Sequence, residues 1–536
     1  MDESIKINDS LIHRVNVGDL LTRSAARYPM KEAVIDGARR FTYREFEAYA
    51  NQIAHGLLEL GYQRGDAIAL MSGNSADFLA TYFACGKIGV ICVPINLFWR
   101  GGELAYVLKH ADIRAVVVEA ELLEQLVSGF EKGQQVEHVI VIGDIENGIQ
   151  ILPEGVKSLS FEAVAAGKSD EVPRVLVEDR DPISYLYTSG TTSTPKGVVS
   201  SHMAVYLETL STVIDTKMTS DDKATVMMPA FHTAQLNCIC TPVFAAGGAS
   251  YIMKKFEAGT LLDLIEKEKL TVLFALSPMY HALLELQRKR KRDVSSLRLA
   301  VYAMAPMPDS HLRAAMKEFG CGFSLMFGQT EMNPLAIYFR PEHQLSHSGA
   351  AGIPVVNVQA AIMDGEGKLL PQGETGEIVY RSPNALSGYL HAPEATQEAF
   401  RHGWFHSGDV GHVDKDGIFW FTDRFKDVIK SGGENVASIE VEKALMEAEP
   451  KIAEVVVVGL PHQRWTEAIT AVIVPREGEK IDQDALLMKL RERISPYKCP
   501  KAIIIADRLP KTSTGKIQKG VVRKDYANLY GQEEAN

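Results

Sequence analysis

Short apolar runs rich in β-branched residues recur along this 536-residue chain and alternate with stretches of helical periodicity. From residue 17 to residue 96 the pattern predicts helix, strand, helix, strand, helix and strand in turn. Further strand patterns stand at 113–120, 138–144, 270–276 and 297–304. Such alternation is typical of parallel sheets covered by helices. The sequence therefore predicts an α/β fold.

The pattern changes near Ile378. Strand signals at 377–382 and 417–423, with a turn at 414–417, predict antiparallel hairpins. A compact α+β unit follows, with helices at 441–448 and near 482–494 and strands at 454–461, 468–475 and 501–507. We expect an N-terminal domain over 1–423 and a small C-terminal domain over 424–536, with a hinge between Asp423 and Lys426.

The net charge of −11, from 57 basic and 68 acidic side chains, provides no global field that would attract nucleic acid. No apolar run is long enough to span a bilayer, and the first residues lack the apolar core of a secretory signal. The 6 cysteines show neither disulfide-scaffold density nor the spacing of a metal site. These features favour a cytoplasmic protein.

The most informative stretch is the loop inside YLYTSGTTSTPKGVV, residues 185–199, which strand signals flank on both sides. Its small residues let backbone N–H groups approach a polyphosphate, and its hydroxyls and Lys196 add donors and a cation. The alternative is a solvated Ser/Thr-rich turn. A Walker loop is excluded, because Pro195 and Lys196 do not follow its spacing and a strand, not a helix, comes next.

This loop resembles the signature of the adenylate-forming superfamily, which includes acyl-CoA synthetases, luciferases and peptide-synthetase adenylation domains. Ser193 stands where that family usually has Gly. Further family segments follow in the expected order at 229–232, 303–306, 327–331, 406–409, 423–436 and 510–516. The resemblance implies parallel-sheet α/β subdomains and a small barrel-like β subdomain in the large domain, followed by a mobile α+β C-terminal domain.

The resemblance also implies which residues bind the substrates. Those expected to contact ATP or AMP are Thr188, Ser189, Gly190, Thr191, Thr192, Lys196, Ala305, Phe327, Thr330, Asp409, Arg424 and Lys516. Asp409 suits the ribose hydroxyls because a carboxylate only accepts hydrogen bonds. Glu331 is the expected Mg²⁺ ligand, since Mg²⁺ binds one or two carboxylates besides phosphate oxygens.

The remaining assignments concern the acyl group, CoA and the hinge. The acyl pocket is expected to include His232, Ala303 and Met304, and Gly433 to border the CoA tunnel. Lys426 matches the hinge position. Lys516, with Thr330 and Glu331, is expected to act in catalysis, and rotation of the C-terminal domain would let one site run two half-reactions.

The function implied by the resemblance is ATP-dependent ligation of a fatty-acid-like carboxylic acid to CoA through an acyl-adenylate, releasing AMP and pyrophosphate. Two enzymatic alternatives stay open: loading of a separate carrier protein, and luciferase-like oxidation, for which Lys430 stands at a suitable position. A non-enzymatic scaffold is disfavoured by the intact set of site residues. The basic run Arg288–Arg292 is a candidate for contact with CoA phosphate or a membrane surface, or a solvated helix end.

Overall fold

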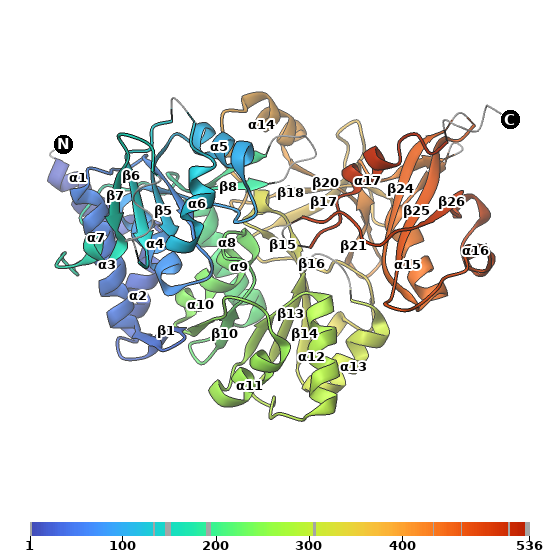
Figure 1. The fold of residues 1–536 in the computed structure, drawn as a ribbon, viewed down its shortest axis with the longest axis horizontal. Coiled ribbons are helices and arrows are strands. Elements are labelled where there is room, and N and C mark those ends of the chain that lie inside the picture. Colours follow the sequence, from blue (N-terminus) through green and yellow to red (C-terminus); the bar gives the residue numbers. More distant parts are fainter. Residues whose placement is uncertain are drawn as a thin grey trace. The chain divides into compact units, whose positions relative to one another are not determined.

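The computed structural model describes residues 3–131, 134–144, 152–188, 195–303, 307–431, 434–462, 464–491, 493–512 and 515–530 (Figure 1). The chain divides into two compact units. Unit 1 comprises Met1–Ala360 and Tyr380–Phe405, and unit 2 comprises Ala361–Val379 and His406–Asn536. These units differ from the two predicted domains, 1–423 and 424–536. The predicted domain boundary marks where we expect the C-terminal domain to rotate, and it stays a prediction.

Unit 1 contains two large sheets, which confirm the expected α/β fold. The first has eight strands in the described residues, in the order β19 (Gly388–Tyr389), β9 (Lys196–Ser201), β8 (Pro182–Thr188), β4 (Ile91–Pro94), β3 (Ala67–Met71), β5 (Ile113–Glu119), β6 (His138–Ile142) and β7 (Lys157–Ser160). The pairs from β8 to β7 are parallel, whereas β8–β9 and β9–β19 are antiparallel.

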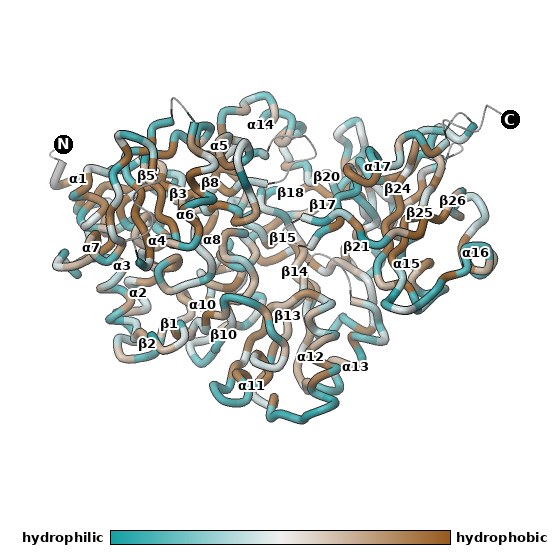
Figure 2. The backbone as a smooth tube through the Cα atoms, in the orientation of Figure 1, coloured by the Kyte–Doolittle hydropathy of each residue, from teal (hydrophilic) through white to brown (hydrophobic). Residues whose placement is uncertain are grey.

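Both faces of this sheet are buried, as parallel sheets require. Along β3, Ile68 and Leu70 pack in a cluster with the helices α3 (Tyr43–Glu59) and α4 (Ala76–Ile88). The alternate residues Ala69 and Met71 pack with α5 (Gly101–His110) and α6 (Leu123–Val127) on the other face. Period-2 alternation thus gives each face its own apolar layer. The strands are correspondingly apolar, brown in Figure 2.

The second sheet of unit 1 has nine strands in the described residues, in the order β16 (Ile353–Pro354), β15 (Leu335–Phe339), β14 (Gly322–Gly328), β13 (Leu299–Ala303), β12 (Val272–Phe274), β10 (Lys223–Val226), β11 (Ala249–Ile252), β1 (Glu32–Asp36) and β2 (Arg39–Thr42). The run from β14 to β1 is parallel, and antiparallel strands flank it at both ends.

The helices of unit 1 connect these strands. They are α1 (Glu3–His13), α2 (Gly18–Arg27), α3 (Tyr43–Glu59), α4 (Ala76–Ile88), α5 (Gly101–His110), α6 (Leu123–Val127), α7 (Phe161–Ala165), α8 (His202–Thr216), α9 (Thr233–Gln235), α10 (Thr241–Ala246), α11 (Ala258–Glu268), α12 (Ser277–Lys289), α13 (Asp309–Phe319) and α14 (Pro393–Ala399). Shorter 3₁₀ and π turns are η1 (Ala120–Leu122), η3 (Leu236–Cys240), η4 (Thr330–Met332), η5 (Pro341–His343) and η6 (Arg401–Gly403). Within the described ranges, no helix has the length and apolar character needed to cross a bilayer.

Unit 2 contains two smaller sheets. The four-stranded sheet runs β17 (Gln359–Met363), β18 (Gly376–Arg381), β20 (Phe405–Val413) and β21 (Phe419–Arg424). The other runs β23 (Glu434–Val436), β22 (Ile429–Ser431), β25 (Thr466–Pro475) and β24 (Ile452–His462), with β26 (Ala502–Ile505) on β25. The remaining elements are α15 (Ser438–Ala448), α16 (Gln483–Arg491), η7 (Pro496–Lys498) and α17 (Lys519–Asp525).

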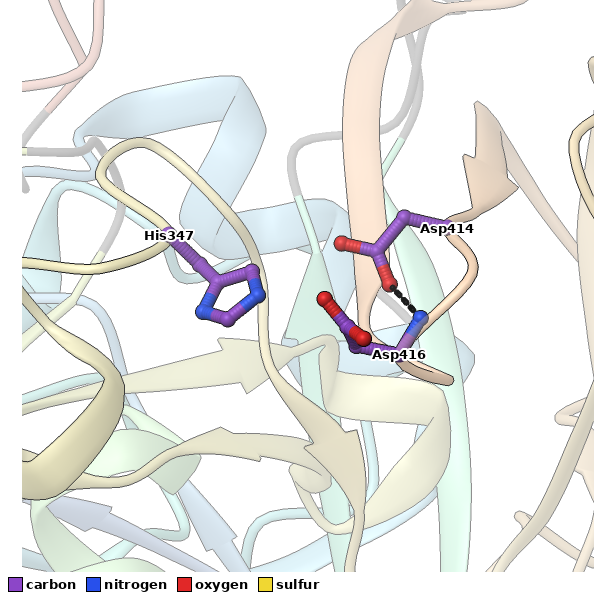
Figure 3. Close-up of side chains that lie close together, drawn as sticks. All are labelled: His347, Asp414 and Asp416. Carbon is purple, nitrogen blue, oxygen red and sulfur yellow. Dashed lines mark hydrogen bonds between the residues drawn. The ribbon is translucent and has the colours of Figure 1, made fainter.

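The predicted turn between β20 and β21 is confirmed. Asp414 accepts a hydrogen bond from the Ile418 N–H, and its carboxylate also accepts one from the Asp416 N–H at 3.0 Å (Figure 3). A positive φ of 80° at Gly417 completes the turn at no steric cost. This hairpin sets β20 and β21 in register and so places the side chains described below.

Candidate functional site

The loop expected to hold phosphate is anchored at both ends. β8 ends at Thr188 and β9 begins at Lys196, and these two residues are register partners in an antiparallel pair. The predicted strand–loop–strand context is therefore confirmed, including the strand that excluded a Walker loop. The loop residues Ser189, Gly190, Thr191, Thr192 and Ser193 lie outside the described residues.

Lys196 and Glu331 are linked through one aromatic side chain. The Lys196 ammonium lies 4.8 Å from the centroid of the Tyr389 ring, and the Tyr389 hydroxyl donates a 3.0 Å hydrogen bond to Glu331 Oε1. Two residues predicted for the site, Lys196 and Glu331, therefore contact the same tyrosine side chain. Sequence reasoning did not identify Tyr389; a Gly–Tyr pair near the end of the large α/β region was its only sequence signal.

The turn carrying Thr330 and Glu331 needs the glycine before it. A Cβ added to Gly328 would lie 1.9 Å from the carbonyl oxygen of Pro334. Gln329 N–H donates to that same carbonyl at 3.0 Å, which closes the turn. Thr330 and Glu331 then begin the 3₁₀ turn η4. Close backbone approach therefore fixes the backbone that leads from the end of β14 to Glu331.

Three further predicted residues stand at one edge of the nine-stranded sheet. Ala303 ends β13, Phe327 lies near the end of β14, and His232 follows β10 after a short connection. The carboxyl ends of parallel strands meet at the same edge, where α/β folds bind ligands. The neighbouring Met304 and Ala305 lie outside the described residues. Topology thus supports the expected placement of the acyl and nucleotide residues.

His232 presents a neutral imidazole. Its Nε2 atom is enclosed and has no hydrogen-bond partner in the described part of the chain, and its ring packs 4.6 Å from that of Phe231. Desolvation lowers the pKa of His232 to about 4, so the ring carries no charge near pH 7. His232 and Phe231 thus place two uncharged rings side by side just beyond β10.

In unit 2 the hairpin brings Asp409 and Arg424 together. They are register partners on β20 and β21, and Arg424 Nε lies 2.7 Å from Asp409 Oδ1. Asp409 is buried, whereas Arg424 is half-buried. The guanidinium supplies donors to this carboxylate, whose oxygens only accept hydrogen bonds when it is ionised. The pair has the chemistry that ribose hydroxyls or a phosphate would require.

The segment before Asp409 is held by Glu377, a residue that sequence reasoning missed. Glu377 Oε2 bonds His406 Nδ1 at 2.7 Å, and its Oε1 accepts the Gly408 N–H at 2.9 Å. Gly408 has a φ of 71°, which a glycine adopts without strain. Only an acidic residue within an apolar strand pattern could have drawn attention to this contact.

Lys516 lies in a turn closed by Thr512, whose Oγ1 accepts the Lys516 N–H at 3.1 Å and whose N–H donates to the Lys516 carbonyl. The side chain has solvent access, yet partial desolvation and, next, the positive charge of Arg424 lower the pKa of Lys516 to about 8. Asp409 and Asp427 oppose this shift, while Lys426 adds to it. The predicted cationic residues of unit 2 therefore interact with one another.

The expected hinge segment is tied to its neighbours by side chains. Buried Asp423 accepts the N–H and the hydroxyl of Ser438, each at 2.6 Å, at the start of α15. Arg523 pairs with Asp427 at 2.6 Å and donates to the Lys426 carbonyl at 3.3 Å. Partial burial lowers the pKa of Lys426. Gly433, expected at the CoA tunnel, lies outside the described residues.

The basic run Arg288–Arg292 ends α12 and continues beyond it. Arg292 pairs with Asp263 at 2.9 Å, and Lys291 pairs with Glu318. Arg288 lies 3.7 Å from Glu285. Because acidic neighbours offset much of this charge, the arrangement fits a solvated helix end, and contact with a membrane or with CoA stays a prediction.

Comparison with known proteins matches most of the chain to two family models. The model of the AMP-binding enzyme matches residues 21–390, and that of the AMP-binding enzyme C-terminal domain matches residues 440–516. The first match ends just after Tyr389, so it includes both Lys196 and Glu331. Together the matches contain the phosphate loop, the His232 region and Lys516.

Individual relatives cover nearly the whole chain. A feruloyl-CoA synthase of Amycolatopsis is 36% identical over 95% of this chain and 99% of its own. The long-chain-fatty-acid–CoA ligase FadD13 of Mycobacterium tuberculosis is 30% identical over 96% and 99%. Among solved structures, the anthranilate CoA ligase AuaEII in complex with anthranoyl-AMP has a TM-score of 0.86 at 29% identity, over 96% of this chain and 98% of that one.

Proposed function

The chain belongs to the AMP-binding enzyme family as an AMP-forming acid–CoA ligase, and we propose that its substrate is a compact, apolar carboxylic acid, with an aromatic acid preferred. In this reaction a carboxylate oxygen attacks the α-phosphorus of ATP and pyrophosphate leaves. The thiol of CoA then attacks the acyl carbon of the acyl-adenylate and AMP leaves. Activation is needed because oxide would otherwise be the leaving group of the carboxylate.

The observation that carries the substrate proposal is the neutral surface at His232. Its pKa of about 4 leaves it uncharged, and the adjoining Phe231 ring adds apolar surface. The segments expected to line the pocket, 232–246, 300–307 and 325–334, carry no charged side chain except Glu331. An apolar acyl or aryl group matches such a wall better than a charged one. Relatives named for feruloyl and anthranilate substrates favour the aryl group.

Glu331 suits Mg²⁺. Its carboxylate supplies the hard oxygen donor that this ion prefers, and among the described residues one of its two oxygens, Oε1, accepts the Tyr389 hydroxyl. Bound Mg²⁺ would neutralise charge on the phosphates of ATP. We propose that Glu331 holds the ion, that Thr330 and Lys196 bind phosphate, and that Thr188 begins the loop around it.

In unit 2, we propose that Asp409 accepts the ribose hydroxyls, that Arg424 contacts ribose or phosphate, and that Lys516 stabilises charge at the α-phosphate during adenylation. Ammonium groups placed where charge develops lower the barrier of such a step. Lys426 serves as the hinge on which the range 424–536 turns before CoA attacks. A cytoplasmic location and a role in fatty-acid metabolism belong to the same proposal, and carrier-protein loading is the competing outcome.

A panel of carboxylic acids, scored by AMP release with and without CoA, tests this function. We expect benzoate- and cinnamate-type acids to give the highest kcat/KM, and we expect CoA to accelerate AMP release. Preference for dicarboxylic or amino acids would contradict the neutral pocket. Unchanged AMP release on adding CoA, together with acceleration by a carrier protein, would show that CoA is not the acceptor.

A further inference from the structure

We propose that Tyr389 is a positioning residue that holds Glu331 and Lys196 in the arrangement that MgATP requires. The inference rests on the proposed roles of Glu331 and Lys196, and it assigns to β19 a task in nucleotide binding. Tyr389 does not itself touch the reacting atoms in this account. It acts through the two charged side chains that it contacts.

One side chain contacts both charged groups in different ways. The Tyr389 hydroxyl donates to Glu331 Oε1 at 3.0 Å, so this bond restrains the carboxylate. The face of the same ring lies 4.8 Å from the Lys196 ammonium, within the range of a cation–π contact. In the described ranges Lys196 has no ion pair or side-chain hydrogen bond, so its ammonium pairs with the Tyr389 ring instead.

The backbone around Tyr389 is fixed to the same two segments. Tyr389 is the register partner of Val198 on β9, and the Leu390 N–H donates to the Gly197 carbonyl at 2.8 Å. On the other side, the Leu386 N–H donates to the carbonyl of Glu331 at 2.7 Å. The segment 386–390 therefore bridges the strand that begins with Lys196 and the turn that carries Glu331.

The hydroxyl is a reliable donor in this place. A phenol hydroxyl can donate a hydrogen bond, whereas a carboxylate oxygen only accepts one, so the direction of this bond is fixed. A hydrogen bond to a charged acceptor is stronger than one between neutral groups. Pre-orienting the carboxylate before the ion binds lowers the entropy lost on binding.

A purely structural role for Tyr389 is the alternative. In that case loss of the hydroxyl would lower stability without altering how the enzyme responds to Mg²⁺. Tyr251, on β11, offers a matched control. Its hydroxyl also donates to a glutamate, at 3.2 Å from Glu268 Oε2. Tyr251→Phe removes a bond of the same type at a position with no assigned part in nucleotide binding.

The experiment compares Tyr389→Phe, Tyr389→Leu and Tyr251→Phe with the unmodified enzyme. Calorimetry measures the affinity for ATP with and without Mg²⁺, and adenylation is followed as Mg²⁺ is titrated. For Tyr389→Phe we expect about tenfold weaker MgATP binding and a higher Mg²⁺ requirement, with affinity for Mg²⁺-free ATP little changed. Tyr389→Leu, which also removes the ring beneath Lys196, is expected to weaken binding with and without Mg²⁺.

Saturating Mg²⁺ is expected to restore much of the Tyr389→Phe rate, and Tyr251→Phe is expected to match the unmodified enzyme. The inference is overturned if Tyr389→Phe and Tyr251→Phe have the same Mg²⁺ dependence. A Glu331→Gln variant separates the two levels of the argument. If neither Glu331→Gln nor Tyr389→Phe changes the Mg²⁺ dependence, the proposed role of Glu331 is wrong. If Glu331→Gln changes the Mg²⁺ dependence and Tyr389→Phe does not, only the proposed role of Tyr389 is wrong.

Discussion

The charge state of Lys516 depends on its neighbours. Partial desolvation and the guanidinium of Arg424 both disfavour an ammonium, and Asp409 only partly opposes them. A pKa of about 8 places the titration of this group just above neutral pH. An ammonium that acts in adenylation is therefore present below pH 8 and lost above it.

We predict that adenylation depends on the ammonium of Lys516, which substitution and pH both test. Lys516→Ala should lower adenylation by about 10²- to 10³-fold, because a cation at the developing charge is lost, yet leave thioester formation from supplied acyl-AMP nearly intact. In the unmodified enzyme, pyrophosphate exchange should fall as pH rises through about 8. Lys516→Arg keeps its charge and should lack this decline.

The two half-reactions serve as each other's controls. Thioester formation from supplied acyl-AMP should show no decline that depends on Lys516 over the same pH range. Equal losses in both half-reactions of Lys516→Ala, or an alkaline decline that persists in Lys516→Arg, would remove Lys516 from the adenylation step.

Met304 directly follows Ala303, the last residue of β13, and is one of the residues expected to line the acyl pocket. Each buried methylene contributes about 0.8 kcal/mol, so a methionine side chain in a closed slot would favour short or compact acids. Met304→Gly should move the kcat/KM optimum towards longer acids. The measurement is a chain-length series, and an unchanged profile would place this side chain in the core.

At the scale of the element, apolar periodicity predicted the central strands well because both faces of a parallel sheet are buried. β3, β4, β5 and β6 all stand where β-branched runs predicted them. β1 stands where a strand was predicted, but its hairpin partner β2 was missed, since the exposed Arg39 and Arg40 give β2 no apolar pattern. A helix was also missed at Glu3–His13, where the apolar pattern is weak.

The site was predicted unevenly for a physical reason. Asp409 and Arg424 stand in recognisable motifs, and a hairpin with a short turn must bring them close. Tyr389 acts through a hydroxyl contact with Glu331 across 58 positions, and no local pattern encodes such a contact. Sequence motifs therefore identified the charged groups but not the aromatic side chain between them.

The hinge segment supplies a prediction at this scale. Within the described residues, the Lys426 N–H donates no backbone hydrogen bond, so proline can replace it without losing one. Proline fixes φ near −65°, and a rotation about this residue would then be blocked. Lys426→Pro should retain adenylation and impair thioester formation, measured by pyrophosphate exchange and by thioester release from acyl-AMP.

Lys426→Ala is the matched control, because it removes the charge while leaving φ free. It should perform both half-reactions at similar rates. If Lys426→Pro shows normal kinetics in both steps, the rotation pivots at another residue.

At the scale of the whole molecule, distant segments are joined by polar contacts within the core of unit 1. The fully buried His202 begins α8, and its Nδ1 accepts the Val17 N–H at 3.2 Å. Desolvation lowers the pKa of His202 to about 4, below the ordinary value of 6.5. The folded state therefore holds a neutral ring that the unfolded chain would protonate first.

This linkage predicts acid sensitivity. Above pH 6.5 the neutral His202 costs the folded state no stability. As pH falls from 6.5 towards 4, protonation of His202 in the unfolded chain lowers the free energy of unfolding by about 3 kcal/mol at most. His202→Asn keeps an acceptor for Val17 but does not titrate, so it should lose less stability on acidification. Urea unfolding at pH 7 and pH 4.5 measures the difference, with the exposed His13→Asn as control. Equal losses in all three proteins would contradict this account.

The pairing of β9 with β19 also has a consequence for biosynthesis. Ribosomal synthesis makes β9 long before Gly388 and Tyr389, so the nascent chain carries an uncovered sheet edge until the second strand emerges. Such edges invite pairing with other chains. A chain that stops at residue 386 and one that continues through Phe405 both leave β18 without β20, and only the shorter one also leaves β9 uncovered. We therefore expect the shorter chain to aggregate more during expression, as sedimentation of the two products would measure. The strand that carries Tyr389 thus also covers an edge at which the growing chain is exposed to self-association.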